Sequence, residues 1–209
     1  IETLFADYLD PLAATLAYHY ERAAVSDKAV TYLIRAAHRA KSIFANEEAI
    51  ACYCTALVQV STILQRIGTA DKEWLQTRVD LNEHLGDVLA LIGKHDDALA
   101  AYHNALADVP GQDVICQSRL YLKCAKVLEV HHKLVDSLQT YELAESVLGQ
   151  PPADGTPVLW WQAWLDVNLN REWLFYWRNQ KAEMVALAEK IQPILVQSGT
   201  PDQRATRSE

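Results

Sequence analysis

The chain has few of the residues that interrupt helices, with 7 glycines and 7 prolines among 209 residues. Most of these residues gather at four places: Gly68, Pro110-Gly111, the stretch 149–157, and 199–201. Between these breaks no long stretch alternates apolar and polar residues as a half-buried strand does. Half of the chain is hydrophobic, which is enough for a real core. The sequence therefore argues against a sheet and predicts an all-α fold.

Motifs that carry chemistry are also missing. The chain has no Gly-rich phosphate loop followed by Lys-Ser/Thr, no Gly-x-Gly-x-x-Gly and no Gly-x-Ser-x-Gly. The acidic pairs Glu47-Glu48 and Asp96-Asp97 begin predicted helices, where carboxylates offset the helix dipole. We therefore expect no enzyme activity in this chain, no catalytic residues and no cofactor.

The four cysteines do not suggest a disulfide framework. Cys52 and Cys54 point to roughly opposite sides of a predicted helix, and Cys116 and Cys124 are too far apart along another one to bond. Reduced thiols are the simple interpretation, as in a cytoplasmic protein.

The histidines do not suggest a metal site. His131 and His132 are adjacent on a predicted helix and diverge by about 100°. His84 and His95 could approach each other across a predicted turn, but no further ligand completes a structural zinc site. We therefore expect no bound metal.

Charge and hydropathy exclude two classes of partner. The net charge is −8, and no basic stripe is present to neutralise a phosphate backbone. There is no signal peptide and no run of about 18 apolar residues. We expect neither nucleic-acid binding nor a membrane span, and we expect a cytoplasmic location.

What the chain does have is a recurrent pattern of small and bulky residues. The stretch 82–110 contains, in order, Leu85-Gly86, Leu89, Gly93, Ala98, Tyr102, Ala105 and Pro110. This order resembles the tetratricopeptide (TPR) signature, a helix-turn-helix unit of about 34 residues. Small residues allow two helices to approach closely, and the bulky ones fill the space beside them.

The pattern recurs as pairs of small residues that are 12 positions apart. The pairs are Ala17/Ala29, Ala37/Ala49, Gly86/Ala98, Ala125/Ser137 and, more weakly, Asn170/Ala182. A large apolar residue follows four positions later at Leu33, Tyr53, Tyr102 and Tyr141, and an alanine after three more at Ala36, Ala56, Ala105 and Ala144. The segment 28–44 serves in two consecutive pairs, which leaves the repeat count open.

These observations predict a TPR-like right-handed superhelix of antiparallel helix pairs with about nine helices. The expected helices are 3–24, 28–43, 46–67, 72–92, 95–108, 112–130, 134–148, 157–178 and 180–197, with Asp27, Asn46, Asp71 and Thr156 as N-caps. One helical repeat domain over 1–198 is expected, with 149–156 as a hinge within it, followed by a polar tail over 199–209. The first residue and the polar tail suggest a fragment of a longer protein.

A closer resemblance is found over residues 12–57. The strings Leu16-Ala17-Tyr18-His19-Tyr20-Glu21-Arg22-Ala23, Asp27-Lys28-Ala29-Val30-Thr31-Tyr32-Leu33-Ile34-Arg35-Ala36-Ala37 and Phe44-Ala45-Asn46-Glu47-Glu48-Ala49-Ile50-Ala51-Cys52-Tyr53 are similar to a TPR subclass. That subclass follows the ATPase domain of large signalling proteins, namely STAND-type ATPases and those linked to class III adenylate or guanylate cyclases. The resemblance implies a sensor or docking arm of such a protein.

The TPR register also predicts which residues line the concave groove. In the unit of Gly86 they include Asp80, Glu83 and Asp87, three acids on one helix face. In the unit of Ala125 they include Arg119 and Lys126. The functional interpretation is a cradle for a basic or mixed-charge peptide, and the alternative is an ordinary solvated helix face.

One known TPR specificity can be compared position by position. Chaperone-binding TPRs hold a C-terminal carboxylate with five polar residues. Here Arg119 and Lys123 fill two of those places, whereas His84, Ile34 and His38 occupy the other three. We therefore do not expect a carboxylate clamp.

Five of the six tryptophans lie between residues 160 and 177. Trp160 and Trp164 share one helix stripe, and Trp161 belongs to another. A helix that is apolar on two sides is normally sandwiched in a core. The alternative is an exposed docking patch at Trp160, Trp161 and Trp164, because tryptophan is enriched at binding hot spots.

The sequence thus predicts a non-catalytic protein-interaction or regulatory module. Its partner would be a protein, a peptide or another domain of the same chain. Two alternatives stay open: a domain that senses a small-molecule effector, and an arm for self-association into a homo-oligomer.

Overall fold

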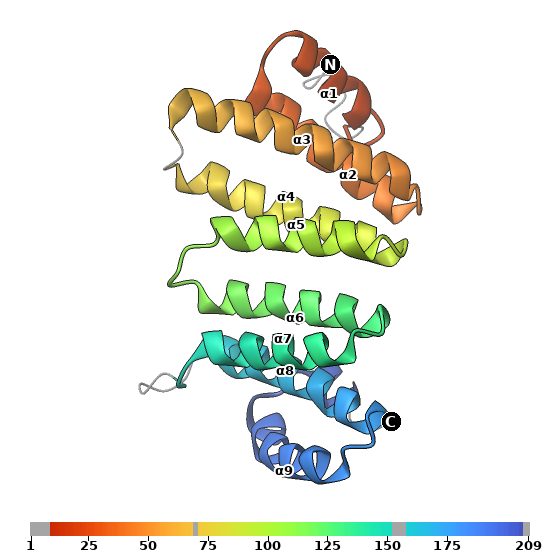
Figure 1. Ribbon diagram of the computed structural model, residues 1–209. Coiled ribbons are helices and arrows are strands. Elements are labelled where there is room, and N and C mark those ends of the chain that lie inside the picture. Colours follow the sequence, from red (N-terminus) through yellow and green to blue (C-terminus); the bar gives the residue numbers. More distant parts are fainter. Residues whose placement is uncertain (1–8, 69–70, 152–157, 207–209) are drawn as a thin grey trace. The chain divides into compact units, whose positions relative to one another are not determined.

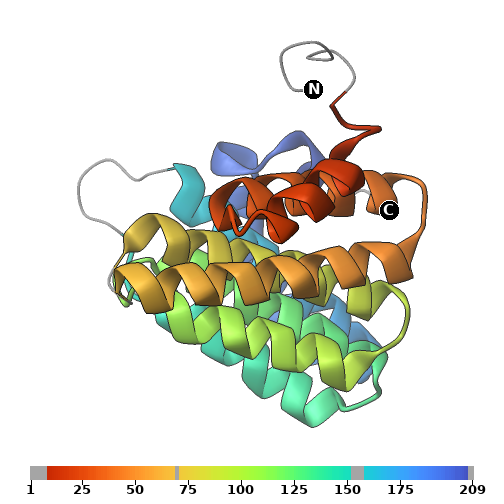
Figure 2. The same ribbon diagram turned by 90° about the horizontal axis from the view of Figure 1, so that it is seen from above.

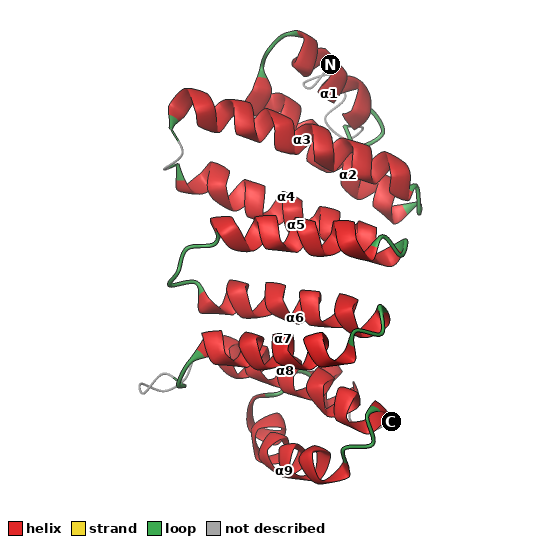
Figure 3. Cartoon of the chain, viewed as in Figure 1, coloured by secondary structure: helices red, strands yellow, loops and turns green. Residues whose placement is uncertain are grey.

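The computed structural model of the chain describes residues 9–68, 71–151 and 158–206. Within these ranges the chain forms ten α-helices and no strand (Figures 1 and 3). The all-α prediction is therefore confirmed for the part of the chain that the structure describes. The chain divides into two compact units, Ile1–Val109 and Pro110–Glu209.

The first unit contains helices α1 to α5. Their bounds are Ala13–Arg22, Ser26–Ser42, Asn46–Ile67, Lys72–Leu91 and His95–Asp108. Each helix packs against the next one along the chain. Helices α2 and α3, and likewise α4 and α5, lie antiparallel and side by side (Figures 1 and 2).

The second unit contains helices α6 to α10. Their bounds are Val114–Val130, Leu134–Leu148, Val158–Trp177, Lys181–Ser198 and Pro201–Thr206. Helix α6 packs against α7, and α8 packs against α6, α7 and α9. The short helix α10 contacts α8 and α9.

Five of the turns between consecutive helices have the same backbone geometry. Each contains one residue with a positive φ, namely Ala24, Phe44, Gly93, His132 or Asn179, two positions before the next helix starts. In the turn at Gly93, the Gly93 amide donates to the Ala90 carbonyl at 3.1 Å and the Lys94 amide to the Leu89 carbonyl at 2.9 Å. This is the Schellman arrangement, and the other four turns repeat it with the same residue offsets.

The first four predicted pairs of small residues lie in the buried core. The residues of the first four pairs are buried, and so are the bulky residues and alanines that follow them: Ala17, Ala29, Ala37, Ala49, Ala98, Ala125, Ser137, Leu33, Tyr53, Tyr102, Tyr141, Ala36, Ala56, Ala105 and Ala144, with Gly86 in the same position. Helix α2 packs against both α1 and α3, as its two roles in the pattern predict. The sequence pattern thus identified the helix contacts of these four pairs.

The fifth pair, Asn170/Ala182, is wrong. Ala182 is exposed, and the interface between α8 and α9 is formed by Leu165, Leu169, Leu187, Ile191 and Leu195. In the first four pairs the positive-φ residue follows the first small residue by seven positions, whereas Asn179 follows Asn170 by nine. Large aliphatic side chains, and not small residues, set the contact between these two helices.

Several predicted helix ends also differ from the structure. Helix α1 begins at Ala13 after a turn at residues 9–12, and residues 3–8 of the predicted 3–24 helix lie outside the described residues. Asp71 is an N-cap, because its carboxylate accepts from the Glu73 and Trp74 amides. Asp27 and Asn46 lie inside helices whose N-caps are Val25 and Ala45, and Thr156 lies outside the described residues.

Two features were not expected from the sequence. Asp113 caps α6 by accepting from the Cys116 amide. Residues 201–206, within the predicted polar tail, form α10, which Gln203 fixes to α8 by donating to the Gln162 carbonyl at 2.9 Å and to Asp166 Oδ1 at 2.6 Å. The hinge predicted over 149–156 has only its first three residues within the described part of the chain.

One helix, α3, is long and apolar enough to cross a membrane by length and composition alone, over Asn46–Ile67. The sequence predicts this helix over the same residues, 46–67, but it was not expected to be long and apolar enough to cross a membrane. In the structure α3 packs against α2 and α4, and Tyr53, Ala56 and Val60 on this helix are fully buried. One face of α3 is thus packed against its neighbours, whereas Val58 and Ile67 are exposed.

Candidate functional site

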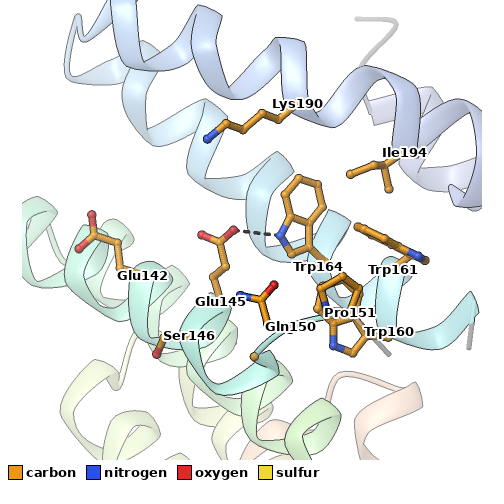
Figure 4. Close-up of a pocket in the computed structure, with 11 residues that line it drawn as sticks. Glu142, Glu145, Ser146, Gln150, Pro151, Trp160, Trp161, Trp164, Lys190 and Ile194 are labelled. Atoms are coloured by element: carbon orange, nitrogen blue, oxygen red, sulfur yellow. Dashed lines mark hydrogen bonds between the residues drawn. The ribbon is translucent and has the colours of Figure 1, made fainter. Parts of the chain in front are cut away.

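The second unit contains an open pocket of about 650 Å³, which we call the tryptophan pocket (Figure 4). It lies between the C-terminal part of α7, the following residues 149–151, the first part of α8 and the middle of α9. Its lining residues are Glu142, Glu145, Ser146, Gly149, Gln150, Pro151, Trp160, Trp161, Trp164, Lys190 and Ile194. This volume is in the range of small-molecule sites.

The three tryptophans named from the sequence all line this pocket, but they differ in role. Trp160 is buried, and its indole N–H donates to the Leu148 carbonyl at 3.1 Å. Trp161 and Trp164 are half-buried. The rings of Trp160 and Trp161 are perpendicular with centres 4.7 Å apart, and those of Trp161 and Trp164 are nearly so at 6.0 Å. Trp160 therefore anchors the pocket, while Trp161 and Trp164 present aromatic surface to it.

A polar network fixes Trp164. Its indole N–H donates to Glu145 Oε1 at 2.9 Å, and the other oxygen of Glu145 pairs with Arg171 Nη1 at 2.7 Å. Arg171 also donates to Asn168 Oδ1 at 2.6 Å, and Asn168 donates to the Trp164 carbonyl at 2.9 Å. Asn168 is fully buried. Glu145, Arg171 and Asn168 each bond to two partners and so hold the Trp164 indole in place, which orders the pocket wall before a ligand arrives.

Opposite charges lie at the edge of the pocket. Glu142 on α7 and Lys190 on α9 are both exposed. Figure 4 shows them on one side of the pocket, with Trp161 and Ile194 on the other. The pocket thus has a charged side with both signs and an apolar side.

Helix α8 is also part of the core, as the alternative interpretation of its two stripes predicts. Val167 and Leu174 pack in one cluster with Ala125, Tyr141 and Ala144. Leu165 and Leu169 pack in another with residues of α9. The remaining aromatics near the end of the helix, Trp173, Tyr176 and Trp177, are exposed. The tryptophan-rich segment is therefore core, pocket wall and exposed surface at different positions.

The predicted acidic groove residues of α4 lie in different environments. Asp80 is exposed and accepts from Gln76 Nε2 at 2.8 Å, whereas Glu83 is buried. Asp87 is half-buried and accepts from the Tyr102 hydroxyl at 2.9 Å. Of the three, Asp80 is the one whose side chain is broadly available to a partner.

The predicted basic residues lie on α6 in the second unit. Arg119 and Lys126 are exposed and Lys123 is half-buried. Arg119 Nη2 lies 3.5 Å from Cys116 Sγ. These residues belong to a different unit from the acidic residues of α4.

Sequence reasoning did not find Glu142, Glu145 and Lys190 as neighbours of the tryptophans. They come from α7 and α9, and the loop between α7 and α8 separates the first two from the tryptophans in the sequence. The one available signal was the spacing of Trp164, Asn168 and Arg171, which places all three on one helix face.

The sequence was compared with protein-family models and with curated proteins. No family model matches the chain, and no curated protein matches it.

Proposed function

We propose that this chain is a non-catalytic TPR-like module that binds a protein or peptide partner in the cytoplasm. As the sequence resemblance suggests, it would regulate a larger signalling ATPase or nucleotide cyclase. The observation that carries this proposal is the recurrence of one turn geometry and one pattern of buried small residues across successive helix pairs. Repeat stacks of this kind present extended surfaces, which such proteins use for binding.

Exposed groove positions provide the test. Asp80→Lys in the first unit and the double variant Arg119→Glu, Lys126→Glu in the second reverse the charge of exposed side chains. Asn104→Lys, exposed on α5, is the matched control for Asp80→Lys. Buried Glu83 and hydrogen-bonded Asp87 are left unchanged so that the fold is preserved.

Proteins captured by the wild-type chain and by Asn104→Lys should be lost or depleted with a groove variant. Circular dichroism should show that every variant keeps its helix content. Equal capture by all variants would remove the groove from the proposal.

A second candidate function is the sensing of a small-molecule effector, and the tryptophan pocket favours it. Trp161 and Trp164 offer stacking surface, and Glu142 and Lys190 offer charges of both signs. A metabolite that binds the folded chain should raise its melting temperature and change its tryptophan fluorescence. Trp161→Ala should abolish both changes, whereas Trp177→Ala, an exposed position outside the pocket, should not.

Self-association is favoured by a different observation, the exposed aromatic group of Trp173, Tyr176 and Trp177. Their rings contact one another at 5.9 and 5.4 Å between centres. Light scattering over a range of concentrations tests this alternative, with Trp177→Ser expected to shift the chain toward the monomer. A wild-type chain that stays monomeric at all concentrations would exclude it.

A further inference from the structure

Three aromatic side chains from successive helices meet in the first unit. His38 of α2, Tyr53 of α3 and His84 of α4 form a triangle of rings. The centres of His38 and His84 are 5.3 Å apart, those of Tyr53 and His84 are 6.0 Å apart, and those of His38 and Tyr53 are 6.2 Å apart. His38 is exposed and His84 is half-buried, so solvent reaches the pair.

Tyr53 adds an unsatisfied polar group to this triangle. Its side chain is fully buried, and its hydroxyl has no hydrogen-bond partner in the protein. In contrast, the equivalent tyrosines of the later repeats donate to carboxylates, Tyr102 to Asp87 and Tyr141 to Glu129, both at 2.9 Å. A buried hydroxyl without a partner calls for a water, an ion or a ligand beside it.

The chemistry of the pair suits a metal ion. Neutral imidazole is the form that binds metals, and the rings of His38 and His84 approach each other from α2 and α4 at an angle of 89°. Imidazole nitrogens are ligands that zinc, nickel and copper share.

We propose that His38 and His84 together bind one divalent transition-metal ion of the zinc, nickel or copper type. An ion at about 2.0–2.1 Å from one nitrogen of each ring would lie between the two imidazoles. Among the described residues no three His, Cys, Asp or Glu side chains converge on one point, so the protein supplies two ligands. Waters complete the coordination, and one of them can bond to the Tyr53 hydroxyl.

This site would have a structural consequence. Helices α2 and α4 belong to successive helix pairs, separated by α3. A bound ion would therefore join two repeats and stabilise the first unit, and its remaining coordination positions would stay open to a ligand atom from a partner. Imidazole ligands select borderline ions over magnesium or calcium, which prefer oxygen.

Thermal unfolding of the full chain, after removal of metals with EDTA, tests the proposal. Zinc chloride at about ten times its Kd should raise the melting temperature by about 4 °C, and magnesium chloride should not. His38→Gln and His84→Gln should each lose most of this rise. His103→Gln, an exposed histidine of α5 in the same unit, should keep it. An equal rise in all variants, or no rise in the wild type, would overturn the proposal.

A second measurement needs no variant and so does not depend on folding of the mutants. During titration of the wild-type chain with copper, the imidazole NMR signals of His38 and His84 should broaden together and before those of the other histidines. Broadening that begins at any other histidine places the ion elsewhere and contradicts the proposal.

Discussion

The ring of Tyr102 occupies the space that a side chain at Gly86 would need. A Cβ placed on Gly86 would clash with Cε1 of that ring and would lie 2.7 Å from Cδ1. Tyr102 cannot easily move away, because its hydroxyl donates to Asp87, the residue next to Gly86. Glycine is thus required here by a neighbour in space, and not by its backbone conformation.

The variant Gly86→Ala should therefore be destabilised by overpacking, by about 2 kcal/mol. Chemical denaturation with urea measures the change in the free energy of unfolding. The matched control is Gly111→Ala, where a Cβ would meet nothing within 4 Å. If both variants lose the same stability, the contact with Tyr102 is not the cause.

The five equivalent turns predict opposite effects for two substitutions at the same turn position. Phe44 has a φ of +61° and its side chain is 80% exposed, so it bears the steric cost of a left-handed conformation without packing in return. Phe44→Gly should stabilise the chain by about 0.5–1 kcal/mol, and Gly93→Ala should destabilise it by about 1 kcal/mol. Opposite signs in melting experiments are the expected result. A loss of stability in both variants would show that Phe44 contributes packing that outweighs the strain.

Tyr53 and Tyr141 allow the free-energy contribution of a hydrogen bond from a buried tyrosine hydroxyl to be measured. Tyr141 and Tyr53 are both fully buried, but Tyr141 donates to Glu129 Oε2 whereas the Tyr53 hydroxyl has no partner. Tyr141→Phe should cost about 1.5–3 kcal/mol, since it removes a hydrogen bond to a charged group. In EDTA, Tyr53→Phe should be neutral or stabilising. Equal losses in the two variants would contradict this difference.

Alkaline pH should destabilise the first and the second unit. Burial raises the pKa of Cys124 from 9.0 to about 12, and burial with the charge of Asp87 raises that of Tyr53 from 10.0 to about 12. The folded state therefore keeps protons that the unfolded state releases. The contribution of Cys124 is fully present below pH 9 and is lost as the pH rises from 9 to about 12.

The slope of the unfolding free energy against pH measures this effect. In Cys124→Ala it should be shallower above pH 9 by up to about 1.4 kcal/mol per pH unit. Cys54→Ala, an exposed position, should keep the wild-type slope. A Cys124→Ala slope equal to that of the wild type would mean that this thiol titrates normally in the folded chain.

The sequence predicted the helices and four of the five small-residue pairs because the information is local. Ala37 and Ala49, or Gly86 and Ala98, lie in consecutive helices, and their fixed spacing follows from one turn geometry. The fifth pair failed because the pattern of small residues ends where Leu187 and Ile191 take over the contact. Periodicity alone does not show that a different class of side chain has replaced the first.

The sites were less predictable because they depend on distant segments. Trp161 and Trp164 stand out in the sequence because five of the six tryptophans lie close together. Glu142 and Lys190 line the same pocket only because α7 and α9 pack beside α8. His84 was considered with His95, its neighbour across the turn, yet it contacts His38 of an earlier repeat. The burial of Glu83 likewise depends on neighbours that a helix-face argument does not include.

Gln203 joins the last described helix to the wall of the tryptophan pocket. The side-chain amide of Gln203 donates to the Gln162 carbonyl and to the Asp166 carboxylate. These two residues lie on either side of Trp164 along α8, and Gln162 directly follows Trp161. Any force that displaces α10 therefore pulls on the stretch of α8 that carries both pocket indoles. A displacement of this end of the chain would reach the pocket through Gln203.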